Sequence, residues 1–140
     1  MSNQITTTRS PAAIAHQRES QRRHGALKRA AVQALRLEGC WVWPQNTGSV
    51  ETKEGRWVRM GVAGIVDIIG SIPVPCPVPD GQASAGHLAC RRCAGTGHVA
   101  RALAVEVKTG TGELNADQES FLAEARRRGW WIWLCRDIDG

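Results

Sequence analysis

The sequence predicts one α/β domain whose core runs in the order helix, three strands, helix, strand, with a small cysteine-rich insertion. Three observations lead to this fold class. A chain of 140 residues has the length of a single domain that can bury its own core. Its 42% hydrophobic and 22% charged residues are ordinary globular proportions, which exclude a disordered or fibrous chain. Segments with helical periodicity also alternate with short, apolar, β-branched runs.

The charge balance points to a polyanionic partner. Eighteen Lys and Arg residues against 13 Asp and Glu residues give a formal net charge of +5 and a pI near 9.3, so nucleic acid is the first candidate. The N-terminal 20 residues lack an apolar run of signal-peptide length, and no stretch approaches 18 apolar residues. We therefore expect a cytoplasmic, intracellular protein that does not span a membrane.

The N-terminal part of the chain predicts a tail followed by a helix. Residues 1–14 are polar and rich in Ser and Thr, which favours a flexible tail before a domain at 15–140. Within 16–38, Ala and Leu recur at helical spacing while Arg and Lys occupy the remaining arc, and Gly39 follows as a C-cap. This pattern predicts an amphipathic helix with a basic face.

Two apolar segments after this helix predict strands. Residues 40–44 are aromatic and β-branched and end at a turn-like segment, 45–48. Residues 62–72 are apolar apart from one carboxylate, Asp67, so we expect a central strand that carries this acid. Residues 56–60 could form another strand.

The C-terminal part predicts a strand, a helix and a strand. In residues 101–108, Glu106 and Lys108 share one face of the strand because side chains alternate. A helix follows from the N-cap Asn115 to residue 128, and 130–135 form a last buried strand. Four tryptophans recur at every second position of predicted strands, so we expect them in the core or on a dimer surface: Trp41, Trp43, Trp131 and Trp133. Two cysteines on predicted strands should be small buried hydrophobes: Cys40 and Cys135.

Acids within apolar strands require compensation. Moving an unpaired charge from water into the protein interior costs on the order of several kcal/mol. A divalent cation held by Asp67 and Glu106 would provide the compensation, since carboxylate oxygens suit Mg²⁺ or Mn²⁺. Lys108 projects from the same face and could offset charge that develops on a phosphodiester. The alternative is an ion pair on an edge strand.

The segment AVEVKTGTGELNADQESFLAEARRRGWWIWLCRD resembles the second half of a VRR-NUC domain, a branch of the PD-(D/E)XK nuclease superfamily. Upstream, GVAGIVDIIG resembles the Gly-x-x-Asp strand of this family, and LRLEGCWVWPQNTGS resembles the segment that joins its first helix and first strand. These pieces cover most of residues 24–137 apart from the insertion. The resemblance implies a restriction-endonuclease-like core.

The resemblance also implies roles for individual residues. Asp67, Glu106 and the carbonyl of Val107 would bind the catalytic Mg²⁺ or Mn²⁺, Lys108 would be the catalytic lysine, and Gln118 would help to order the site.

Three positions depart from the family pattern. Val66 stands where the family favours proline, and Pro44 stands where it often has an arginine that contacts phosphate. The first helix of the family usually carries a glutamate that faces the metal, but the corresponding position of this sequence, fifteen residues before Gly39, is His24. Either His24 takes that role or Glu19 does from a longer helix, and we favour His24.

The activity that the resemblance implies is metal-dependent hydrolysis of DNA phosphodiesters. Small family members resemble Holliday junction resolvases, so we expect an endonuclease selective for branched or flap-like DNA, acting as a homodimer in DNA repair or recombination. The alternative is a noncatalytic, zinc-dependent DNA-binding protein on a decayed nuclease fold, and a thiol or chaperone adaptor is a further rival. The adaptor would leave the acids and the lysine without a role.

The insertion, residues 73–99, predicts a zinc site. It is rich in Pro and Gly and poor in large apolar side chains, so it cannot form a core by itself. Cys90 and Cys93 form a Cys-x₂-Cys loop typical of zinc ligands, and Cys76 is the obvious third thiolate. An odd number of cysteines without an export signal also indicates metal rather than disulfides.

The fourth zinc ligand is either His98 or His87. His98 gives a Cys-x₂-Cys-x₄-His pattern that resembles the retroviral-type zinc knuckle, and we favour it. Four protein ligands leave no open position for water, so this zinc would be structural. Arg91 and Arg92 would then be held out towards DNA phosphates.

Overall fold

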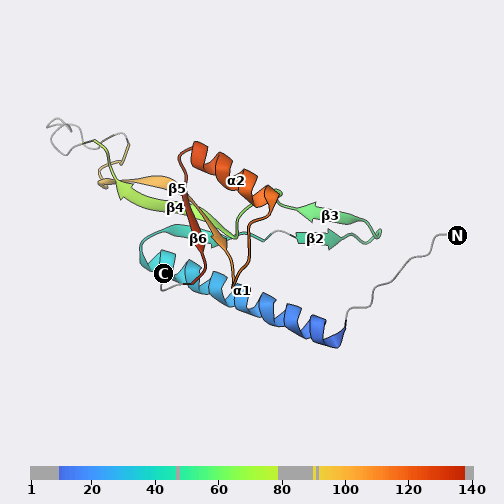
Figure 1. Cartoon of the computed structure of the whole chain (residues 1–140). Helices are drawn as coiled ribbons and strands as arrows, with labels where there is room; N and C mark the ends of the chain where they lie inside the picture. Colours follow the sequence, from blue (N-terminus) through green and yellow to red (C-terminus); the bar gives the residue numbers. More distant parts are fainter. Residues whose placement is uncertain (1–9, 47, 79–89, 91, 138–140) are drawn as a thin grey trace.

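The computed structural model describes residues 10–46, 48–78, 90 and 92–137, which form a mixed α/β fold (Figure 1). Four strands form one sheet in the order β1-β4-β5-β6, and two more form a separate hairpin, β2-β3. The elements follow the chain as α1 (Pro11–Leu37), β1 (Trp41–Pro44), β2 (Gly48–Glu51), β3 (Trp57–Met60), β4 (Ile68–Pro75), β5 (His98–Val107), α2 (Ala116–Arg127) and β6 (Trp131–Cys135).

The main sheet is mixed, and β5 lies inside it. β4 pairs antiparallel with both β1 and β5, with Ile68 opposite Val105. β6 runs parallel to β5, with Glu106 opposite Leu134. Parallel neighbours need a crossover, and α2 supplies it. Glu106 therefore pairs with β6 on one side and lies one residue beyond the last pair with β4 on the other.

The two helices cover opposite faces of the sheet (Figure 1). On the α1 face, Ala31 and Val32 pack in a cluster that includes Val105 and Val107 of β5. On the α2 face, Leu122 packs with Ala104. The alternation expected for residues 101–108 is thus present, and Glu106 is buried on the side opposite Val105 and Val107.

Helix α1 begins earlier than the sequence pattern predicts. Ser10 is the N-cap, its side chain accepts a hydrogen bond from the Ala13 amide, and Pro11 occupies the first helical turn. Residues 11–14 are therefore helical rather than part of a tail over 1–14, while 1–9 lie outside the described residues. No helix in the described part of the chain combines the length and apolar character that crossing a membrane requires.

Two strand predictions need correction. The strand expected over 62–72 begins only at Ile68, so Asp67 lies in the preceding loop rather than inside the strand. Residues 56–60 do contain a strand, β3, but it pairs with β2 in a separate hairpin and not with the main sheet. β2 begins at Gly48, the last residue of the predicted turn 45–48. The short β2–β3 hairpin projects from the main sheet (Figure 1).

The insertion is shorter than the predicted range 73–99. Pairing continues between β4 and β5 as far as Pro75 and His98, so both ends of the predicted insertion belong to the sheet. Alternating prolines at positions 73 and 75 do not prevent this pairing. Residues 79–89 and 91 lie outside the described part of the chain.

The tryptophans are more exposed than a core position requires. Trp41 is 73% exposed and Trp131 is 47% exposed, so the core assignment is wrong for both, whereas Trp133 packs against the α1-side core. Trp41 and Trp43 contact each other edge to face on the sheet edge. Their role in a dimer surface stays a prediction. Cys40 and Cys135 are buried, as expected.

Gly64 joins the loop before Asp67 to the start of α2. Its φ is +70°, which non-glycine residues rarely adopt. A Cβ here would overlap the backbone carbonyl of Asp117 and lie 2.7 Å from the Gln118 nitrogen. Only glycine therefore lets this loop pack on α2.

We predict that Gly64→Ala lowers the free energy of unfolding by roughly 2–4 kcal/mol, because backbone strain and steric overlap add. Urea denaturation measures this change. Gly129→Ala is the matched control, since Gly129 has φ +84° but no atom within 4 Å of an added Cβ. It should cost only about 1–2 kcal/mol. Equal losses for the two variants would contradict the close packing at Gly64.

Candidate active site and thiol cluster

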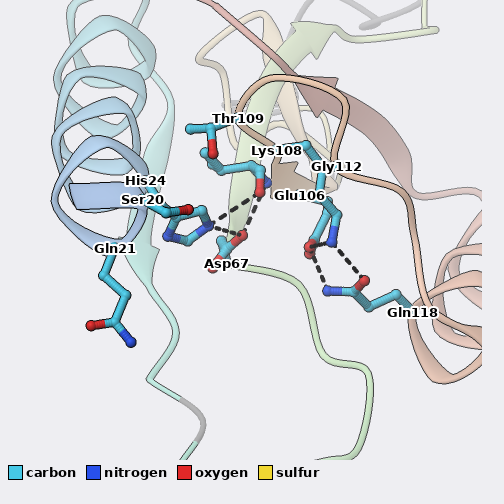
Figure 2. A pocket seen from close by; sticks show the side chains of 10 residues that line it. Ser20, Gln21, His24, Asp67, Glu106, Lys108, Thr109, Gly112 and Gln118 are labelled. Atoms are coloured by element: carbon cyan, nitrogen blue, oxygen red, sulfur yellow. Dashed lines mark hydrogen bonds and ion pairs between the residues drawn. The ribbon is translucent and has the colours of Figure 1, made fainter. Parts of the chain in front are cut away.

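A cavity of about 520 Å³ lies where α1, the start of β4, the end of β5 and the start of α2 meet (Figure 2). It brings together all five residues that the sequence assigns to catalysis, from segments far apart in the chain. They are His24, Asp67, Glu106, Lys108 and Gln118. The backbone of Val107 also lines the cavity.

Asp67 is fixed by the backbone of β5. Its Oδ2 accepts a hydrogen bond from the Val107 amide at 3.0 Å, across the gap between the loop and the strand. The Nζ of Lys28 lies 3.6 Å from Oδ1 of the same carboxylate. Asp67 therefore has one defined orientation although it lies outside β4.

His24 points from α1 towards Asp67 (Figure 2). Its Nε2 lies 3.2 Å from Asp67 Oδ2 and 3.1 Å from the Val107 carbonyl oxygen. Both neighbours are acceptors, so in the absence of a cation the ring donates its Nε2–H to them.

These distances are ordinary hydrogen-bond lengths, and they would also suit neighbouring ligand atoms of one cation. In an octahedral shell with metal–oxygen distances near 2.1 Å, adjacent ligand atoms lie about 3.0 Å apart. The spacings of 3.2 Å and 3.1 Å around His24 Nε2 are close to that value. The donor set of carboxylate, carbonyl and imidazole is also chemically suited to Mn²⁺, and its oxygen members to Mg²⁺.

Glu106 is the most constrained group in the cavity. Its side chain is 2% exposed. Oε1 accepts hydrogen bonds from Lys108 Nζ, at 3.1 Å, and from Gln118 Nε2, but Oε2 is buried and has no partner among the described residues. Burial, and then the nearby Asp67 charge, raise the pKa of Glu106, against the opposing effect of Lys108. This unpartnered carboxylate oxygen could serve as a ligand to a cation.

Gln118 is held in place by the helix that carries it. Its backbone N–H donates to the Asn115 side chain, and its Oε1 accepts from the Asn115 amide, which completes a capping box at the start of α2. The same Oε1 accepts from Lys108 Nζ at 2.8 Å. The helix cap therefore positions Lys108 and Glu106 together.

Sequence reasoning missed Lys28 and Gln21. Lys28 donates to the Gln45 carbonyl at 2.6 Å and pairs with Asp67, and Gln21 lines the cavity. Spacings of three and four residues from His24 put both on its side of α1, which could have revealed them. Glu19 does not line this cavity, and its carboxylate pairs with Arg22 and Arg23.

The three cysteines of the insertion form a second cluster. The Sγ atoms of Cys76, Cys90 and Cys93 all lie within 4.8 Å of one another, so this cluster could hold a metal ion such as zinc. Cys76 Sγ and Cys90 Sγ are 3.8 Å apart. A tetrahedral site with Zn–S bonds of 2.3 Å has sulfur–sulfur edges of about 3.8 Å, so the spacing fits.

The turn that carries the thiols is suited to thiolate. Backbone amides of Cys93 and then of Arg92 hold the pKa of Cys90 at about 7, below the usual thiol value. The turn closes through a hydrogen bond from the Ala94 amide to the Cys90 carbonyl, 2.7 Å. Cys76 is attached to the far side of the turn, because its amide donates to the Gly97 carbonyl.

His98 is not part of the thiol cluster. Its Nδ1 lies 3.2 Å from the Thr96 carbonyl oxygen, at the first residue of β5. His87 and Arg91 lie outside the described residues, and Arg92 is exposed. The choice of His98 over His87 as fourth ligand stays a prediction.

None of the protein-family models, curated proteins or solved structures compared with the chain matches it.

We predict that Glu106→Gln stabilises the metal-free protein at pH 7 by on the order of 1 kcal/mol, because it removes a charge that burial disfavours. The raised pKa of Glu106 means that the folded state holds this proton more tightly than the unfolded chain. The parent therefore loses stability as pH rises through the pKa of Glu106 in the folded state. Below about pH 4 Glu106 is protonated in both states, so the parent and Glu106→Gln should have similar free energies of unfolding. Urea denaturation in EDTA at several pH values measures it. A pH-independent difference would contradict burial as the cause.

Proposed function

We propose that the chain is a Mg²⁺- or Mn²⁺-dependent DNA endonuclease with a restriction-endonuclease-like core of the VRR-NUC type. One observation carries the proposal. Oxygen donors from Asp67, Glu106 and the Val107 carbonyl meet in one cavity beside Lys108, and one buried oxygen, Glu106 Oε2, has no partner among the described residues. A purely structural ion pair would not need an unsatisfied buried carboxylate oxygen.

Asp67, Glu106 and the Val107 carbonyl would hold the cation, with His24 completing the donor set on the α1 side. When bound, the cation would polarise the phosphodiester and lower the pKa of a water molecule.

The chain's own groups then have separate tasks. Lys108 brings a positive charge to the cavity and offsets charge that grows on the phosphate oxygens. Gln118 keeps the ammonium group in place, since its Oε1 accepts a hydrogen bond from Lys108. The acidic lining is otherwise unfavourable for a phosphate, so Lys108 and Lys28 are needed for substrate to approach.

We further propose that two chains act together on branched or flap-like DNA. One domain of this size has one catalytic cavity, and cutting two strands of a junction requires two. The exposed Trp41 and Trp43 on the edge strand β1 are a candidate contact between the copies. Light scattering of the free protein and of its complex with four-way DNA tests this association, and a monomer in both would contradict it.

Asp67→Ala, Glu106→Ala and Lys108→Ala should each lower the cleavage rate at least about a hundredfold, because each removes a group that acts on the cation or the phosphate. The assay uses labelled linear, flap and four-way DNA with Mg²⁺, Mn²⁺ or EDTA. Asp117→Asn is the matched control, since Asp117 lies on α2 next to Gln118 but does not line the cavity. It should cleave like the parent.

His24 can be tested in the same assay. His24→Ala should impair cleavage, and His24→Glu should keep or raise activity in Mg²⁺, because a carboxylate is a harder ligand than imidazole.

If Asp67→Ala, Glu106→Ala and Lys108→Ala all cut DNA like the parent, the proposed nuclease function is wrong. If the parent binds DNA but does not cleave it, the noncatalytic DNA-binding alternative is favoured.

We also propose that the thiol cluster binds one structural Zn²⁺ per chain, with His98 or His87 as fourth ligand. Soft thiolates select zinc, whereas the Asp67 and Glu106 oxygens prefer Mg²⁺ or Mn²⁺, so one chain can keep two metals apart. Zinc would supply the folding energy that this apolar-poor insertion lacks.

Elemental analysis of the purified protein should find one zinc per chain, and Cys90→Ser should lose it because one strong ligand is removed. Cys40→Ala is the control, since it removes a buried thiol outside the cluster and should retain zinc. Comparison of His98→Ala with His87→Ala identifies the fourth ligand. A parent protein without zinc would refute the proposed site.

A further inference from the structure

The excess positive charge of the chain lies on one helix. α1 contains six Lys and Arg residues and one Glu, so its formal charge of +5 equals that of the whole chain. The remaining sequence is therefore balanced. A concentration of charge on one element is the electrostatic pattern expected of a polyanion-binding surface rather than of a generally basic protein.

Three arginines of α1 form a line. Arg22, Arg29 and Arg36 are spaced by seven residues, which returns to nearly the same side of a helix. Arg22 and Arg29 line a cavity of about 550 Å³, and Arg29 and Arg36 line the next, of about 510 Å³. The three side chains thus lie along two hollows in series.

These hollows continue from the active site. Gln21 lines both the catalytic cavity and the first arginine cavity, and Gly25 lines both arginine cavities. Lys28 lines the second arginine cavity and also lies 3.6 Å from Asp67 Oδ1. A chain-like ligand could therefore run from the catalytic cavity along α1 without leaving the surface.

The lining is suited to phosphates. The second arginine cavity has no acidic residue among its described lining residues, and Arg29 forms no ion pair with any described residue. Arg36 is oriented in advance, because its Nη2 donates to the Val42 carbonyl at 3.0 Å. The guanidinium groups of Arg29 and Arg36 are therefore well matched to phosphate oxygens, whereas Arg22 is in an exposed ion pair with Glu19, which lines the first arginine cavity.

We propose that Arg22, Arg29 and Arg36 form a track for the sugar–phosphate backbone of a DNA strand that leads away from the catalytic cavity. Their span of fourteen residues is about 21 Å along the helix, roughly six phosphates at 3.4 Å each. The choice of DNA rests on the proposed nuclease function. The track binds any sequence, since it contacts phosphate and not base edges.

Fluorescence anisotropy with labelled DNA, over 50–200 mM salt and without added Mg²⁺, Mn²⁺ or chelator, tests the track without cleavage while the thiol cluster keeps its zinc. Arg29→Ala should weaken binding by about five- to tenfold at 0.1 M salt and reduce the slope of log K against log salt by about one. Arg29→Lys should keep the parental slope because it keeps the charge. Arg126→Ala is the matched control, since Arg126 is an exposed arginine of α2 with no ion pair to a described residue.

Arg126→Ala should leave both the affinity and the slope close to the parental values. Equal effects of Arg29→Ala and Arg126→Ala, or no effect of Arg29→Ala, would refute the track. If heparin of matched charge displaces DNA, and heparin binding depends on Arg29 as strongly as DNA binding does, a site built for DNA is also refuted.

The outcomes separate this inference from the nuclease proposal. If the parent binds DNA through Arg29 but never cleaves it, the track stands and the nuclease function fails. If the parent cleaves DNA and Arg29→Ala binds and cleaves normally, the nuclease function stands and the track fails. If the parent neither binds nor cleaves DNA, both fail.

Discussion

The site depends on a carboxylate that the fold buries and only half satisfies. Glu106 lies on an inner strand at 2% exposure, with Oε1 hydrogen-bonded and Oε2 without a partner among the described residues. Leaving such an atom unpaired costs about 1–3 kcal/mol, or more when it is charged. Lys108 and the capped Gln118 both contact Oε1, so they stabilise the carboxylate but leave Oε2 without a partner in the described part of the chain. A bound cation would remove this cost, which is the physical basis of the proposed metal site.

A second constraint, the close packing at Gly64, brings distant segments together at the site. The loop before β4 can approach α2 only because position 64 is glycine, and this approach brings Asp67 and Gln118 to the same cavity. α1 has a double role, since Ala31 and Val32 bury one part of it in the core while His24 lies near Asp67. Packing and site geometry are therefore coupled, and a change in one should be felt in the other.

Much of the fold and of the candidate site could be predicted from the sequence, because periodicity and local caps carry that information. The alternation in residues 101–108 correctly separated Val105 from Glu106, and Asn115 correctly marked the start of α2. Asp67 was misplaced onto a strand because a continuous apolar run does not reveal where pairing begins. The exposure of Trp41 was missed because period two does not say whether a strand lies at a sheet edge. Helical spacing shows that Lys28 shares a side of α1 with His24, but not that it contacts Asp67, because that contact is tertiary.

The most direct test of the central claim is the anomalous scattering of Mn²⁺ in crystals of the protein grown at pH 7 with this ion. The nuclease account predicts one strong peak within coordination distance of Asp67, of the previously unpartnered Glu106 Oε2 and of the Val107 carbonyl, with distances of about 2.0–2.3 Å. It also predicts no such peak in Glu106→Gln crystals. A parent site that stays without Mn²⁺ at saturating concentration, with Glu106 still buried and unpaired, would contradict it.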